Sequence, residues 1–123
     1  MTASPAHIYI VDDDTSFGRS LKRLLNARGL EAVYFQSAGA FLESVPFDRK
    51  GGVAIIDISM PECDGFALMD KMNSKGYGIP VILITGHAQI NTHKIAMERG
   101  ALGFLEKPFK EEFLLDLIEP LIK

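Results

Sequence analysis

Short runs of apolar residues alternate with longer amphipathic stretches along the whole chain. The runs are rich in branched residues, which favour strands, and they occupy 8–11, 32–35, 53–56, 81–85 and 102–105. Between the first two runs, Phe17, Leu21, Leu24 and Leu25 recur at the spacing of one helix face. The later intervals, and the segment after the last run, show the same spacing. The pattern predicts five strand–helix units.

The predicted helices have recognisable ends. Glycine readily adopts the left-handed conformation that ends helices, and it follows three of them, at Gly29, Gly76 and Gly100. Ser37 is expected to cap a short second helix. The third helix turns Phe66, Met69 and Met72 inward, the fourth covers 89–99, and the fifth is marked by Phe113, Leu117, Ile118 and Leu121.

Five consecutive strand–helix units predict an α/β fold, in which helices cover both faces of a parallel sheet. The first, third and fourth runs are almost entirely apolar, as central strands are. The second and fifth runs adjoin Glu31 and Glu106 and therefore suit the edges. We expect a flavodoxin-like (βα)5 doubly wound five-stranded sheet, in the order 2-1-3-4-5, forming a single domain over residues 1–123.

The composition narrows the classes of function. The length of 123 residues suits one domain, and no apolar run approaches the length of a membrane span. The net charge of −3 argues against nucleic-acid binding by this segment. Residues 1–5 lack the regions of a signal peptide, and the single cysteine, Cys63, cannot form an internal disulfide. These features favour a cytoplasmic location.

Polar residues stand where the predicted strands end. In chain order they are Asp12, Asp13, Asp14, Asp57, Thr85 and Lys107. Neighbouring parallel strands lie about 4.8 Å apart, so these side chains should share one cleft. Each has a structural explanation when taken singly, because acids before a helix cap it and an Asp–Gly pair forms a turn. Their coincidence on adjacent strand ends indicates a reaction site.

Carboxylates that lie close together favour a hard divalent cation with oxygen ligands. We expect Mg²⁺ or Mn²⁺ at this site. The expected direct ligands are Asp13, Asp57 and the backbone carbonyl of Ser59, with Asp12 acting through a bound water.

An aspartate carboxylate can attack phosphorus and form an aspartyl phosphate. Asp57 is the expected nucleophile, because its strand delivers it to the middle of the predicted cleft. Lys107 supplies a positive charge, and Thr85 a hydroxyl donor, for the oxygens of a transferring phosphoryl group.

Four segments resemble the receiver domain of two-component response regulators: VDDD at 11–14, DISMPECDG at 57–65, ITGH at 84–87 and GALGFLEKPF at 100–109. The TGH and EKPF variants are most similar to regulators with a helix-turn-helix output domain. The resemblance implies that Asp57 accepts a phosphoryl group from a sensor histidine kinase, with Mg²⁺ required. It also implies a cis peptide bond between Lys107 and Pro108.

The resemblance further implies a conformational switch. Thr85 moves toward the phosphoryl group, Phe104 rotates inward, and the face formed by the fourth helix, fifth strand and fifth helix changes shape. That face is expected to control an output, and the expected output is transcription. The expected partners are a C-terminal DNA-binding domain beyond this chain and a second copy of the protein, which would form a homodimer through the same face. Ser59 and His87 flank the site and are candidates for tuning the lifetime of the phosphoryl group. His93, on the fourth helix, is expected on a solvated face.

Two other classes use similar residues. A phosphatase of the haloacid-dehalogenase type also has a strand-end aspartate, but its motif requires Thr or Val where Ser16 stands. A flavodoxin-like flavin carrier would present hydroxyls to a phosphate, which the acidic loop at 12–14 would repel. The resemblance to a receiver domain implies that the protein is not an enzyme with a separate substrate. It would catalyse only its own phosphorylation and dephosphorylation. A stand-alone phosphoryl shuttle is the alternative to a regulator with an output domain.

Overall fold

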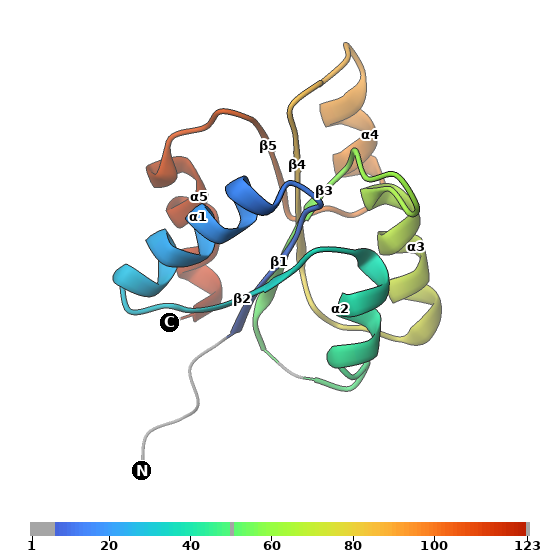
Figure 1. Cartoon of the computed structure of the whole chain (residues 1–123). Coiled ribbons are helices and arrows are strands. Elements are labelled where there is room, and N and C mark those ends of the chain that lie inside the picture. The colour runs from blue at the N-terminus through green and yellow to red at the C-terminus, as the bar shows by residue number, and fades with distance from the viewer. Residues whose placement is uncertain (1–6, 50, 123) are drawn as a thin grey trace.

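Strand and helix alternate five times in the computed structural model, which describes residues 7–49 and 51–122 (Figure 1). The strands are β1 (His7–Val11), β2 (Glu31–Phe35), β3 (Val53–Asp57), β4 (Val81–Thr85) and β5 (Gly103–Glu106). The helices are α1 (Thr15–Ala27), α2 (Ala38–Ser44), α3 (Gly65–Lys75), α4 (Thr92–Glu98) and α5 (Glu111–Ile122). Neighbouring strands are parallel, and their order is β2-β1-β3-β4-β5. The predicted fold class and strand order are confirmed.

Two apolar layers enclose the sheet. Helices α1 and α5 cover one face, and α2, α3 and α4 cover the other (Figure 1). Successive residues of a strand supply opposite layers, so Ile10 and Ile55 pack under α1 and α5 while Val11 and Ile56 pack under the other three helices. Strands β3 and β4 are buried over their whole length, whereas the edge strands β2 and β5 are partly exposed, as the sequence predicted.

Helix α4 is shorter than predicted. The sequence pattern indicated a helix over 89–99, but α4 begins at Thr92 and ends at Glu98. The Thr92 hydroxyl accepts a hydrogen bond from the Gln89 N–H at 2.8 Å, and the Thr92 N–H donates to the Gln89 carbonyl at 3.1 Å. These two hydrogen bonds hold 89–92 as a turn. The N–H and the carbonyl of Gln89 are both bonded to Thr92, so they are not available to extend the helix toward its N-terminus.

The buried face of helix α5 differs from the predicted one, because it does not include Phe113. Leu114 and Ile118 are completely buried, whereas Phe113 is 53% exposed. Residues four apart share a helix face, and Phe113 precedes that buried pair by one position, so it points partly to solvent. None of the helices in the described part of the chain is both long and apolar enough to cross a membrane.

The loops at the carboxyl ends of the strands are held by short-range contacts. Asp14 caps α1 by accepting a hydrogen bond from the Phe17 N–H at 3.1 Å, and Asp64 caps α3 by accepting from the Ala67 N–H at 2.8 Å. Gly65 brings the start of α3 against β3, since a Cβ atom there would lie 2.8 Å from the Asp57 carbonyl oxygen. The Asp–Gly pair is therefore a helix cap followed by a close backbone approach that positions the end of β3.

Candidate functional site

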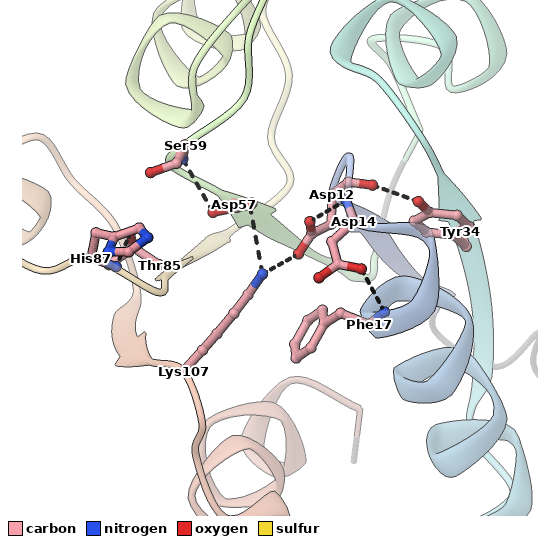
Figure 2. Close-up of polar contacts among 9 residues, drawn as sticks. All are labelled: Asp12, Asp14, Phe17, Tyr34, Asp57, Ser59, Thr85, His87 and Lys107. Atoms are coloured by element: carbon pink, nitrogen blue, oxygen red, sulfur yellow. Dashed lines mark hydrogen bonds and ion pairs between the residues drawn. The ribbon is translucent and has the colours of Figure 1, made fainter.

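Four polar side chains lie at the carboxyl ends of the strands, and ion pairs join three of them, Asp12, Asp57 and Lys107 (Figure 2). Asp12 follows β1, Asp57 ends β3, Thr85 ends β4 and Lys107 follows β5. Within residues 7–49 and 51–122, the buried polar or charged residues are Asp12, Asp57 and Thr85, which are 0%, 5% and 1% exposed. Burying polar groups costs free energy unless they are paired. Their concentration where the strand order reverses indicates a functional site rather than ordinary packing.

Lys107 links the two buried carboxylates. Its Nζ atom lies 2.7 Å from Asp12 Oδ2 and 3.6 Å from Asp57 Oδ2 (Figure 2). The backbone N–H of Lys107 donates to the Thr85 carbonyl at 2.8 Å, which fixes where the side chain leaves β5. The peptide bond to Pro108 is cis, as the family resemblance implied. The ammonium therefore lies between two acids and neutralises part of their charge.

The three consecutive acids after β1 have different surroundings. Asp12 is buried, and its Oδ1 accepts a hydrogen bond from the Asp14 N–H at 2.9 Å. Asp14 is the exposed cap of α1 described above. Asp13 is exposed and stands between them. The capping explanation therefore accounts for Asp14 alone and leaves Asp12 and Asp13 for the site.

Burial, and after it the charge of Asp12, raise the pKa of the Asp57 carboxyl group from 3.8 to about 6. The Ser59 N–H, which donates to Asp57 Oδ1 at 3.1 Å, and the Lys107 ammonium both oppose that shift. The Ser59 N–H and Lys107 therefore compensate the buried charge only in part. A further cation beside Asp57 would lower this pKa.

Carboxylate oxygens of Asp12, Asp13 and Asp57 lie within 4.8 Å of one another. In an octahedral Mg²⁺ site, opposite oxygen ligands are about 4 Å apart, so only a small movement would bring these oxygens onto one ion. Both oxygens of Asp12 already have partners, Lys107 and the Asp14 N–H, which fits a water-mediated contact better than a direct one. The acidic cluster is compatible with a metal site.

The hydroxyl of Thr85 is held by the loop that follows β4. Its Oγ1 accepts a hydrogen bond from the His87 N–H at 3.1 Å (Figure 2). Phe104 of β5 is partly buried, and its ring is stacked on the His93 ring with centroids 5.1 Å apart and an angle of 19° between the planes. His93 is exposed, as predicted, but it also contacts the aromatic residue expected to switch. The side chains of Ser59 and His87 are exposed at the rim of the site.

Two residues of the site were not found from the sequence. The Phe17 ring lies under the Lys107 ammonium, 4.1 Å from Nζ to the ring centroid. The Tyr34 hydroxyl donates to the Asp12 backbone carbonyl at 2.6 Å. Both residues fit ordinary core patterns of a helix and a strand. One signal for Tyr34 was available in Gly18, which lies against the Tyr34 ring. A glycine inside a helix costs about 1 kcal/mol of stability relative to alanine, so its presence there calls for an explanation.

The family model for the response regulator receiver domain matches residues 8–119. The chain belongs to this family. It is a signalling domain rather than an enzyme acting on a separate substrate, and the match decides against the phosphatase and flavin-carrier alternatives.

Curated relatives of this receiver domain include a transcriptional regulatory protein and a response regulator protein. The transcriptional regulatory protein FixJ of Bradyrhizobium diazoefficiens is 37% identical over 117 residues, which are 95% of this chain and 57% of FixJ. The response regulator protein TmoT of Ectopseudomonas mendocina is 40% identical over 116 residues, covering 94% of this chain and 52% of TmoT. The chain thus spans about half the length of these relatives.

Solved structures confirm the fold of the receiver domain. The crystal structure of FixJ-N has a TM-score of 0.85 at 35% identity, covering 95% of this chain and 93% of that one. The response regulator StyR has a TM-score of 0.87 at 36% identity, covering 97% of this chain and 60% of StyR.

Proposed function

We propose that Asp57 accepts a phosphoryl group from the phosphohistidine of a sensor histidine kinase and thereby switches the α4–β5–α5 face to control transcription. The observation that carries the proposal is the placement of Asp57. Its buried carboxylate ends a central strand, 3.6 Å from an ammonium and within a cluster of acids that can hold a cation.

The chemistry follows from these contacts. A carboxylate oxygen of Asp57 attacks phosphorus, the bond from phosphorus to the histidine nitrogen breaks, and an aspartyl phosphate forms. The Lys107 ammonium, already beside both buried acids, then interacts with the phosphoryl oxygens. The Thr85 hydroxyl exchanges its contact with the His87 N–H for one to a phosphoryl oxygen. Hydrolysis of the acyl phosphate restores Asp57, and Ser59 and His87 at the rim tune its rate.

Mg²⁺, or Mn²⁺, is the cation proposed for the acidic cluster. Asp13, Asp57 and the Ser59 backbone carbonyl would hold it, and Asp12 would contact it through a water. When bound, the ion supplies positive charge to the oxygens of the transferring phosphoryl group.

Phosphorylation should depend on the metal. With acetyl phosphate and Mg²⁺, intact-mass analysis should show one added phosphoryl group, stable in acid and labile in base. The same mixture with excess chelator should show almost none, because the acids would then repel the incoming phosphate. Equal incorporation with and without Mg²⁺ would contradict the proposed role of the acidic cluster.

The proposed switch links Asp57 to the α4–β5–α5 face through Thr85 and Phe104. Phosphorylation leaves close to two negative charges on Asp57, and the two packings differ in what the phosphate contacts. In the present packing, His87 holds the Thr85 hydroxyl and His93 stacks on Phe104. Inward rotation of Phe104 would break that stack and change the surface of α4.

Replacing Thr85 by alanine should separate phosphorylation from switching. Thr85→Ala should still accept the phosphoryl group, because Lys107 and the metal remain. Backbone NMR shifts on phosphorylation should be large over residues 86–110 in the wild type and should shrink to the neighbourhood of Asp57 in the variant. Samples should be matched for phosphoryl content by intact mass. Shift changes of equal reach in both proteins would show that the signal leaves by another route.

The remaining partners are proposed from the relatives. FixJ is named as a transcriptional regulatory protein and is nearly twice as long as the matched segment, which supports a C-terminal DNA-binding output domain for this receiver. The α4–β5–α5 face is the proposed homodimer surface. A cytoplasmic location is proposed, because a regulator of transcription must reach the DNA. The proposal includes no contact of this domain itself with nucleic acid or with a membrane.

A further inference from the structure

Tyr34 of β2 reaches across the sheet edge to the loop that carries the acids. Its hydroxyl donates to the Asp12 backbone carbonyl at 2.6 Å (Figure 2). Its ring lies against the first turns of α1, where a Cβ atom on Gly18 would be 2.1 Å from Tyr34 Cε1. Only glycine leaves room for the ring in this position. The two residues therefore fit one another and, together, contact both ends of the 12–14 loop.

The Tyr34 hydrogen bond replaces one that the sheet cannot provide. The ladder between β1 and β2 ends with the Asp12 N–H, which donates to the Phe35 carbonyl at 3.1 Å. Beyond Phe35 the chain turns away toward α2, which Ser37 caps. The carbonyl of the fully buried Asp12 thus needs a donor from a side chain. Four polar groups of Asp12 are thus bonded: its N–H, its carbonyl and its two carboxylate oxygens.

The direction of the Asp13 side chain depends on the hydrogen bond between Tyr34 and the Asp12 carbonyl. The Asp12 carbonyl and the Asp13 N–H belong to one planar peptide unit, so fixing the carbonyl fixes the direction in which Asp13 leaves the strand. Asp13 is exposed, and core packing therefore does not hold its side chain. Yet one of its carboxylate oxygens lies within 4.8 Å of oxygens of Asp12 and Asp57.

We propose that Tyr34 and Gly18 form a positioning pair for the metal site. The Tyr34 hydroxyl holds the Asp12–Asp13 peptide so that the Asp13 carboxylate faces Asp57, and Gly18 makes room for the ring that carries the hydroxyl. The inference rests on the proposed binding of Mg²⁺ by Asp13 and Asp57. It adds Tyr34 as a residue that sets affinity without touching the ion, in the way that outer-sphere partners orient metal ligands.

Deleting the hydroxyl tests the pair. Tyr34→Phe should weaken Mg²⁺ binding roughly tenfold, measured by titrating the amide NMR signals of residues 11–15. Tyr77→Phe is a matched control, because the Tyr77 hydroxyl also donates to a backbone carbonyl, that of Val45, at 2.5 Å. Tyr77 lies between α3 and β4, at the opposite end of the sheet from Asp57. The control should lose thermal stability to a similar degree and bind Mg²⁺ as the wild type does.

Gly18→Ala provides a second test that leaves the hydroxyl in the sequence. The added methyl group should displace the ring and weaken Mg²⁺ binding as well; if that variant does not fold, the Tyr34→Phe result decides. Wild-type affinity in Tyr34→Phe, or an equal loss in Tyr34→Phe and Tyr77→Phe, would overturn the positioning role alone. Asp13→Ala should abolish binding. Absence of Mg²⁺ binding by the wild type would overturn the proposed metal site and, with it, the pair.

Discussion

Without divalent metal, Asp57→Asn should be more stable than the wild type by an amount on the order of 2–3 kcal/mol at pH 7.5. The pKa of Asp57 rises from 3.8 to about 6 in the folded protein because the group is buried beside Asp12. Each unit of such a shift corresponds to about 1.4 kcal/mol of preference for the neutral form. Asparagine is neutral and similar in shape, so it avoids the cost of burying the charge. The most important polar residue of the site is therefore expected to destabilise the fold.

The same shift sets the pH dependence. A carboxyl group with a raised pKa binds more protons folded than unfolded between about pH 4 and pH 6, so the wild type loses stability as pH rises through that window. The gain from Asp57→Asn should be complete above about pH 6 and should disappear near pH 4. Urea denaturation in chelator at several pH values measures it. Asp116→Asn, which changes an exposed acid of α5, should give less than about 0.5 kcal/mol. A pH-independent gain, or none, would contradict the electrostatic account.

The opposite change is expected when the positive charge is removed. Lys107→Met keeps the length of the side chain but leaves Asp12, which is completely buried, without its ammonium partner at 2.7 Å. Removing one partner of a buried ion pair costs several kcal/mol, since the remaining charge is uncompensated. We expect a loss of about 3 kcal/mol in metal-free buffer at neutral pH.

Two comparisons isolate the charge effect in Lys107→Met. The loss should diminish in acid, where the carboxylates become neutral, and in Mg²⁺, where a second cation compensates them. Lys71→Met removes an exposed lysine from α3 and should leave the free energy of unfolding nearly unchanged. A loss that stays constant across pH and Mg²⁺ concentration would mean that Lys107 acts through packing on Phe17 rather than through charge.

The sequence predicted the fold because its strongest signals are periodic. Uninterrupted apolar runs identified β3 and β4 as central strands, and the acids beside β2 and β5 identified edges. The start of α4 was wrong, because the side chain of Thr92 competes with the backbone and no apolar period records that competition. The inward face of α5 was misjudged at Phe113, since periodicity alone does not choose between adjacent residues.

The site was predictable where strand ends carry unusual residues. Asp57, Thr85 and Lys107 each interrupt or follow an apolar run, and the parallel sheet brings those ends together. The different surroundings of Asp12, Asp13 and Asp14 were partly hidden, because burial depends on the path of the loop. Tyr34 was missed, since its hydroxyl acts on a backbone atom at the end of the neighbouring strand, and only Gly18 gave an indirect signal. Contacts of that kind leave little trace in one sequence.

The most direct measurement is the position of the phosphoryl group itself. After reaction with acetyl phosphate and Mg²⁺, reduction with borohydride converts an acyl phosphate to homoserine, and peptide sequencing by mass spectrometry locates it. We expect homoserine at position 57 and no incorporation in Asp57→Asn. Homoserine at position 12 or 13, or undiminished incorporation in Asp57→Asn, would contradict the assignment of Asp57 as the phosphoryl acceptor.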